Sequence, residues 1–258
     1  MASRAIFKAV IQVDELEVPV KLYSAIREER VRFHLLHEED ETRLEQEMFC
    51  RSEEEPVEQE DRVRGYEISR GQYVILEPEE IKEARPKTDR SMEVLHFVDE
   101  EEIDPRLYHR AYYLGPDGQK NRYALLARAL RHTGRVAICR WAMRGKSYLG
   151  FVKALEKLLL LTTLRFHHQI VPVESLELEE PEVKDKELKM ARNLIDELTA
   201  EFDPSRYRNE HQQALLDLIE KKAKGEEPEK KKPKRKKPTR PSELHEKLAA
   251  SLEEARAG

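Results

Sequence analysis

The sequence predicts a mixed α+β fold in which a β-barrel or β-sandwich core comes first and helices follow it. Short strand-like segments, separated by turn residues, recur at intervals of about ten residues up to residue 120. Two amphipathic helical patterns come after Val173, and a basic run that contains proline follows them. The chain has 258 residues, of which 39% are hydrophobic, so it can bury a substantial core.

The first third of the chain is predicted to be mostly β-structure. Residues 5–23 form two strands around the polar sequence DELE, and Pro19 favours an edge or a strand start. VRFHLLH, at residues 31–37, is predicted to be a further strand, and an acidic loop follows it as far as residue 61. Residues 65–76 predict a hairpin, because their Ser-Arg-Gly turn offers the positive φ that a tight turn requires.

The next elements lead to the first long helix. Pro78 begins a short helix, and residues 92–98 are predicted to be a strand. The Pro-Asp-Gly sequence at 116–118 is a turn signal. Residues 121–131 contain helix formers with apolar side chains four apart, and Gly134 is placed to cap the C-terminus of that helix.

Residues 135–166 combine a strand with a segment that periodicity alone does not assign. In residues 135–144 the apolar side chains at 137, 139, 141 and 143 point one way, while Arg140 and Arg144 point the other. One face of this strand is therefore predicted to be core and the other cationic. Residues 149–166 have a helical composition but lie between a strand and the β-rich sequence TTLRF, so helix and hairpin both remain open.

The C-terminal part is predicted to be helical. Residues 184–199 form one apolar stripe, and Asp203-Pro204 is predicted to be the N-cap and first residue of a second helix that ends near Gly225. Both helices need a partner surface, either on their own barrel or on another subunit. Residues 242–256 predict a short third helix beyond a basic linker.

Basic charge within the folded body is concentrated in residues 120–165. This stretch holds eleven Lys and Arg against a single acid, a balance of +10, whereas residues 1–118 carry −13 and residues 166–220 carry −8. Clustered Lys and Arg displace counterions from phosphates, so the stretch suits a polyanion. The alternative is that these side chains are the solvated faces of one helix and one hairpin.

Composition also limits the compartment and the class of protein. Residues 221–240 carry +8 and contain proline, which predicts a disordered tail. Two unpaired cysteines, Cys50 and Cys139, favour a reducing compartment. The sequence has neither a long apolar span nor a signal peptide, which predicts a soluble, intracellular protein.

The sequence contains no common catalytic signature. It lacks the phosphate-binding, dinucleotide-binding, nucleophile-elbow and zincin motifs, so we expect neither an enzyme nor a cofactor. The His pairs and the acidic runs lack the spacing of metal ligands, and no metal site is predicted. A metal-dependent nuclease that uses the acidic loops is the enzymatic alternative.

Five segments, taken in order, resemble bacterial Ku, the DNA-end-binding protein of non-homologous end joining. They are VPVKLYSA, VRFHLLH, VRGYEISRGQYVIL, LHFVDEEEIDPRLYHRAYYLGPD and RYALLARAL, and the resemblance covers approximately residues 4–225. It implies a homodimer whose Ku-type β-barrels, bridging strands and C-terminal helical arms form a ring around a duplex end. It also implies contacts to sugar and phosphate, recruitment of a multifunctional ATP-dependent DNA ligase, and no catalysis. Some members carry a Cys-x-x-Cys pair after LLH, but here only Cys50 remains, so no zinc site is transferred.

The resemblance sets the predicted organisation and site. It favours a hairpin for residues 149–166, a barrel with its bridge over 1–180, an arm over 181–225 and a basic flexible tail with a short helix over 226–258. The predicted partners are double-stranded DNA ends, a second copy of the chain and the ligase, with no membrane and a cytoplasmic, nucleoid-associated location. The rival function is a nucleoid-type protein that coats DNA through its tail.

The predicted phosphate contacts in the body are Lys120, Arg122, Arg131, Arg140, Arg144, Lys146, Lys153 and Arg165. Those in the tail are Lys230, Lys231, Lys232, Lys234, Arg235, Lys236 and Lys237.

Overall fold

The computed structural model describes residues 4–86, 90–178 and 181–226. The chain divides into two compact units, the first containing residues up to 28 and 34–175, and the second containing 29–33 and the described residues from 176 onward. The strands are β1 (Phe7–Val13), β2 (Leu16–Ser24), β3 (Arg64–Ser69), β4 (Gln72–Leu76), β5 (Ser91–Val98), β6 (Tyr108–Pro116), β7 (Val136–Met143), β8 (Lys146–Leu155) and β9 (Leu158–Leu164). The helices are α1 (Pro78–Glu83), α2 (Lys120–Thr133), α3 (Asp185–Leu198) and α4 (Glu210–Ala223).

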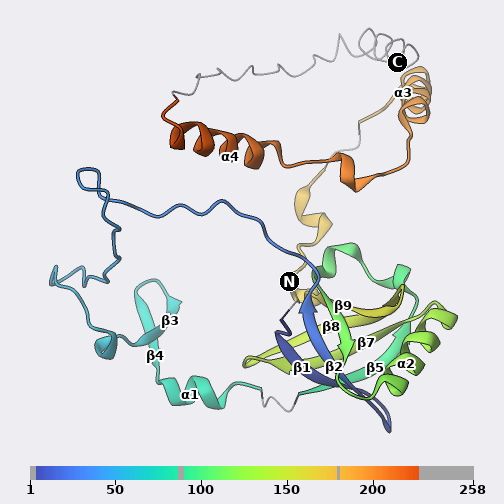
Figure 1. Ribbon diagram of the computed structural model, residues 1–258, viewed down its shortest axis with the longest axis horizontal. Coiled ribbons are helices and arrows are strands. Elements are labelled where there is room, and N and C mark those ends of the chain that lie inside the picture. Colours follow the sequence, from blue (N-terminus) through green and yellow to red (C-terminus); the bar gives the residue numbers. More distant parts are fainter. Residues whose placement is uncertain (1–3, 87–89, 179–180, 227–258) are drawn as a thin grey trace. The chain divides into compact units, whose positions relative to one another are not determined.

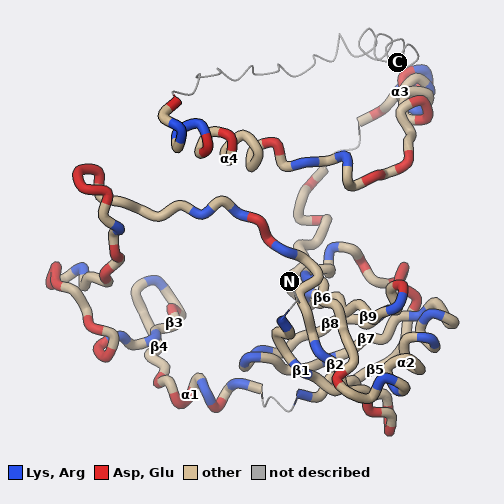
Figure 2. Tube along the Cα trace, viewed as in Figure 1, with Lys and Arg blue, Asp and Glu red and all other residues tan. Residues whose placement is uncertain are grey.

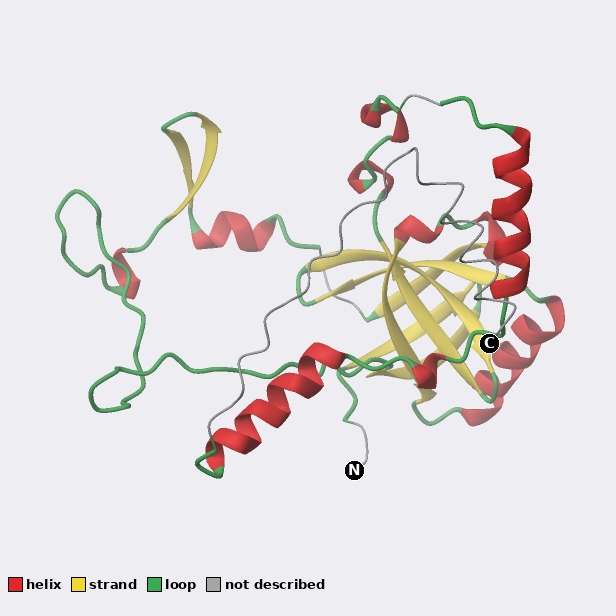
Figure 3. Ribbon diagram, turned by 90° about the horizontal axis from the view of Figure 1, so that it is seen from above, coloured by secondary structure: helices red, strands yellow, loops and turns green. Residues whose placement is uncertain are grey.

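Seven of these strands close into one barrel, which decides between the barrel and sandwich alternatives (Figures 1 and 3). Their order is β1-β2-β6-β9-β8-β7-β5, and the parallel pairing of β1 with β5 closes the ring of otherwise antiparallel strands. Pro19 is the fourth residue of β2 and lies opposite Val10, so neither predicted position, an edge or a strand start, is found, and a closed barrel has no edge strand. The ladder between β2 and β6 begins only at Val20, which leaves the proline just outside that ladder.

The alternation in β7 is confirmed for the core and wrong for part of the opposite face. Cys139 and Trp141 belong to the main core cluster, as predicted. On the opposite face, however, Val136 and Ile138 are buried in a second cluster outside the barrel, together with Ile103 and Phe151. Residues 99–108, with their two 3-10 turns, supply Ile103 and so cover this part of the wall. Only the later part of the face reaches solvent, with Arg140 exposed and Ala142 half-buried.

Helix α2 covers one end of the barrel, which we call the helix end. The helix connects the C-terminal end of β6 to the N-terminal end of β7 and ends at Gly134, which has a φ of 68°. Tyr123 and Leu126 join the main core cluster. The buried Tyr123 hydroxyl donates to the carbonyl of Leu114 and accepts a hydrogen bond from the N–H of Leu159 at 2.8 Å. The helix is therefore fastened to β6 and β9 by one side chain.

Replacing Tyr123 with phenylalanine is expected to destabilise the barrel. The ring still fills its site, but two buried backbone groups lose their partner, which costs about 1–3 kcal/mol of unfolding free energy. Urea denaturation at neutral pH measures the loss. Tyr113→Phe, at a tyrosine with 39% of its surface exposed, is the control and should change the free energy by less than about 0.5 kcal/mol. Equal stability of the two variants would show that the Tyr123 hydroxyl does not fasten the helix.

Residues 25–90 leave the barrel after β2 and return to it at β5 (Figure 1). The strand predicted at residues 31–37 is wrong, because only an isolated bridge between Leu36 and Arg43 forms there. A single segment needs an available sheet edge, and the closed barrel offers none. The hairpin of β3 and β4 is confirmed, with Gly71 at a φ of 78°, and so is the short helix α1.

The alternative left open for residues 149–166 is settled in favour of a hairpin. Strands β8 and β9 pair from Leu155 and Leu158 outward, around a turn in which Glu156 has a φ of 49°. Gly150 permits the close packing of this pair, since a Cβ there would lie 2.6 Å from the carbonyl oxygen of Thr162.

Helices α3 and α4 follow the barrel, as predicted, but α4 begins later than expected. Asp203 caps only a 3-10 turn at Pro204–Arg206, in which its carboxylate accepts the N–H of Ser205. The N-cap of α4 is Asn209, whose side chain accepts the N–H of Gln212 at 3.1 Å. The predicted helix at 242–256 lies outside the described residues.

Candidate nucleic-acid interface

The cations predicted from residues 120–165 do not form one surface. Lys120, Arg122 and Arg131 lie on α2, at the helix end of the barrel. The turn between β7 and β8, which carries Arg144 and Lys146, lies at the opposite end. Figure 2 shows Lys and Arg at both places, on opposite sides of the barrel. β7 has eight residues and spans roughly 26 Å, so its two ends cannot share one binding patch.

We call the opposite end the loop end, because residues 25–90 leave and return there. The pairing of Ser24 with Tyr112, of Met92 with Trp141 and of Leu149 with Leu164 brings these strand ends together. The N–H of Val10 donates to the carbonyl of Arg90 at 2.8 Å, which fixes the returning chain against β1. Any ligand held jointly by the barrel and by residues 25–90 would therefore meet the loop end.

Two of the predicted cations already have anionic partners on the barrel wall. Arg140 lies 2.8 Å from Glu93, and 63% of its side chain remains exposed. Lys153 lies 2.5 Å from Glu100, with only 28% of its side chain exposed. Lys153 would have to break this ion pair to bind a phosphate, so we expect it to contribute least.

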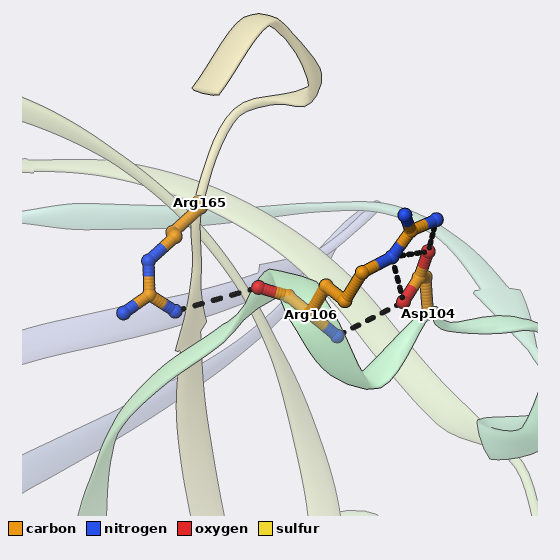
Figure 4. A network of polar contacts seen from close by, with 3 residues as sticks. All are labelled: Asp104, Arg106 and Arg165. Carbon is orange, nitrogen blue, oxygen red and sulfur yellow. Dashed lines mark hydrogen bonds and ion pairs between the residues drawn. The ribbon is translucent and has the colours of Figure 1, made fainter. Parts of the chain in front are cut away.

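Arg165 is placed by a polar network after β9 (Figure 4). Its guanidinium donates to the carbonyl of Arg106 at 3.5 Å and to that of Tyr108. The Arg106 guanidinium is held by Asp104, with Nε 2.8 Å from a carboxylate oxygen. The hydrogen bonds from the guanidinium and the backbone N–H of Arg106 keep the pKa of the Asp104 carboxyl below its usual range. Arg165 therefore supplies positive charge from a fixed position, while Arg106 is neutralised.

The loop end also gathers two arginines that lie outside the basic stretch 120–165. Arg110 lies on β6, and the Arg85 side chain packs over the turn between β7 and β8. A Cβ on Gly145 would lie only 2.8 Å from Cδ of Arg85, which shows how closely this side chain approaches. Both arginines belong to the acidic N-terminal part of the chain, so a charge count by segment hides them. Composition does not show that Arg85 packs against the β7–β8 turn or that Arg110 lies on a strand at the same end of the barrel.

A β-bulge presents two neighbouring residues of β6. The register between β6 and β9 shifts between Tyr108 and Ala111, and such bulges re-aim side chains. The buried Thr163 hydroxyl accepts the N–H of Arg110 at 3.0 Å and lies 3.5 Å from Nδ1 of His109. Burial, then the charges of Arg165 and Arg110, lower the pKa of His109 below its ordinary value. The imidazole therefore lies in a positive local field.

The cysteines and acidic runs do not assemble a metal centre in the part of the chain that the structure describes, where no group of three His, Cys, Asp or Glu is placed to hold an ion. Cys139 is buried, and burial raises the pKa of its thiol. Asp40 caps its own turn, accepting hydrogen bonds from the N–H and hydroxyl of Thr42. None of the helices over residues 4–86, 90–178 and 181–226 is long and apolar enough to cross a membrane. The tail cations from Lys230 to Lys237 lie outside the described residues.

The chain is similar to one known domain family and to several named proteins. The Ku70/Ku80 beta-barrel domain family matches residues 12–190. "Non-homologous end joining protein Ku 2" of Geotalea uraniireducens is 43% identical over 226 residues, which cover 88% of each chain. "Non-homologous end joining protein Ku" of Symbiobacterium thermophilum is 38% identical, over 88% of this chain and 57% of its own. The protein of the same name from Bacillus subtilis is 32% identical, over 86% of this chain and 72% of its own.

These matches confirm the resemblance and the fold class that the sequence predicted. The relatives are named as end-joining proteins and not as enzymes, in agreement with the missing catalytic motifs. The matched region also covers every barrel strand from β2 to β9, the last two residues of β1 and the start of α3. Since the family match spans well over half of the sequence and the relatives align over most of their length, the chain belongs to the Ku family.

Proposed function

We propose that this protein binds the ends of double-stranded DNA in non-homologous end joining, as a homodimeric ring without sequence preference. The observation that carries this proposal is the loop end of the barrel. Arg85, Arg110, Arg144 and Lys146 gather there, where residues 25–90 leave and return, in a chain whose relatives are named for end joining. Cations directed at phosphates bind DNA of any sequence.

The second copy is supported by the apolar side chains of residues 25–90. Phe49, Tyr66 and Tyr73 are 59%, 68% and 61% exposed, although the segment contains a regular hairpin. Exposed aromatic side chains in this number mark an interaction surface. We propose that residues 25–90 of one subunit pack against the same residues of its partner, so that two barrels enclose the duplex. Sedimentation should give a dimer at micromolar concentration without DNA, and a monomer would contradict a preformed ring.

Loading only at DNA ends is the property that distinguishes a ring from a protein that coats DNA along its length. A closed ring can pass onto DNA only at a terminus, whereas a protein that binds through its basic tail needs none. We expect the protein to bind a linear duplex strongly and a covalently closed circle of the same sequence weakly. Equal affinity for the two would favour the nucleoid-type coating function.

We further propose that residues 242–256 recruit the multifunctional ATP-dependent DNA ligase of bacterial end joining. The segment is amphipathic and is joined to the arm through a strongly basic linker, which suits a tethered recognition helix. The chain would then act at DNA ends in the cytoplasm, in association with the nucleoid.

A further inference from the structure

A cavity of about 590 Å³ opens at the loop end of the barrel. Its polar lining includes His109 and Arg110 from the bulge of β6 and Arg144 from the turn between β7 and β8. Its apolar lining includes Ile6, Ile26 and Met143. The cavity is therefore cationic in one part and apolar in another.

The walls of this cavity are held by hydrogen bonds rather than left to exposed loops. Thr163, only 2% exposed, binds the backbone of Arg110 on both its N–H and carbonyl sides. The N–H of Ala25 donates to the carbonyl of Ala111 at 3.2 Å, which holds the start of the departing chain against β6. The Ser24 hydroxyl donates to the carbonyl of Ile26 at 2.6 Å. The lining residues on β6 and at the end of β2 thus have fixed backbones.

The charge of the cavity suits an anion with more than one negative charge. Arg110 and Arg144 line it, Glu28 is the one acid among the lining residues, and His109, with its lowered pKa, contributes a hydrogen-bonding imidazole rather than a charge. Arg165 adds a further positive charge near His109. An internal phosphodiester carries one negative charge, whereas a terminal phosphomonoester carries nearly two and accepts more hydrogen bonds from guanidinium groups.

The volume exceeds that of a phosphate alone and leaves room for a nucleoside. Apolar side chains and Tyr148 offer a surface for a base, and bases stack favourably on such surfaces when they are released from the duplex. Within an intact duplex a base is stacked and paired, so it cannot enter a side cavity. A nucleotide at a frayed end can enter, because it has only one neighbour.

We propose that this cavity binds the phosphorylated terminal nucleotide of a DNA strand, so that the protein reads the chemistry of the end as well as its presence. The inference rests on the proposed end binding and adds a ligand to it. Arg110 and Arg144 hold the phosphate, and the apolar wall receives the unstacked base.

The test compares linear duplexes that differ only at their termini. We expect a 5′-phosphate or a 3′-phosphate to strengthen binding about tenfold over two hydroxyl ends, as for one charge-assisted contact. The terminus that gives the effect identifies which strand end enters. Arg110→Gln and Arg144→Gln should each reduce this discrimination to less than about twofold, whereas Lys120→Gln, at the helix end, should leave it unchanged. Equal affinity of the wild-type protein for phosphorylated and hydroxyl ends would overturn the proposal.

A covalently closed circle separates this inference from the proposed function. If the circle binds as well as the linear duplex, end binding itself is wrong. If the linear duplex is preferred but its terminal phosphate has no effect, only the cavity assignment fails.

Trp141 offers a direct readout of the cavity. It is the single tryptophan of the chain and stacks on the lining residue Tyr148, with ring centroids 5.4 Å apart. Deoxyadenosine monophosphate should change its fluorescence in a saturable way, and unphosphorylated deoxyadenosine should do so only at far higher concentration. Identical titrations for the two compounds would contradict the role of the phosphate.

Discussion

Reversing the charge of the β7–β8 turn, by Arg144→Glu together with Lys146→Glu, is expected to reduce affinity for linear duplex DNA by at least about 100-fold. Two phosphate contacts become two repulsions, and the turn lies at the end of the barrel that also carries Arg85 and Arg110. The fold should tolerate the change, because Glu156, in the β8–β9 turn at the other end of β8, already adopts the left-handed conformation that Arg144 has. Gel-shift titration against a short duplex measures the loss.

Lys120→Glu together with Arg131→Glu is the matched control. It changes the net charge by the same amount on exposed positions, but at the helix end of the barrel. The opposite effects of the two substitutions on the helix dipole should largely cancel in stability, since one lies in the first turn and the other in the last. We expect this variant to lose less than about threefold in affinity. If the control lost more than the turn variant, the DNA would lie against α2 and our choice of the loop end would be wrong.

Truncation after Gly225 is expected to weaken total DNA binding and to flatten its salt dependence. Each neutralised phosphate contributes about −0.9 to the slope of log K against log salt, so a tail that engages four to six phosphates accounts for roughly four to five units. A tethered chain can contact any stretch of duplex, so its loss should weaken binding to circles and linear DNA alike. The ratio of end binding to internal binding should therefore rise.

A shorter truncation separates the tail from the final segment. Removal of residues 241–258 keeps the lysines from Lys230 to Lys237, so the salt slope should stay the same while stimulation of the ligase falls. Undiminished ligase stimulation would exclude residues 242–256 as the recruiting element. Loss of end preference on truncation after Gly225 would instead make the tail the reader of DNA ends.

The elements that the sequence predicted correctly are those whose signals are local. The hairpin of β3 and β4 depends on a glycine at positive φ, α2 on helix formers followed by Gly134, and the core face of β7 on strict alternation. The wrong predictions concern residues whose pairing or burial depends on a segment far away in the sequence. VRFHLLH has the composition of a strand but finds no edge, and Val136 and Ile138 are covered by residues 99–108.

The same distinction holds for the candidate interface. The sequence by itself determined that the chain has the motifs of the Ku family, that residues 120–165 are strongly basic, and that residues 221–240 form a second basic run. The sequence could not determine which cations share a surface. A count of charge along the chain does not show that the eight-residue strand β7 runs from one end of the barrel to the other and so separates the cations before it from those after it. Only the tertiary structure divided Lys120, Arg122 and Arg131 from Arg144 and Lys146, and brought Arg85 and Arg110 to the latter. Strand pairing and barrel closure determine which cations share a surface, since they bring together residues that are far apart in the sequence.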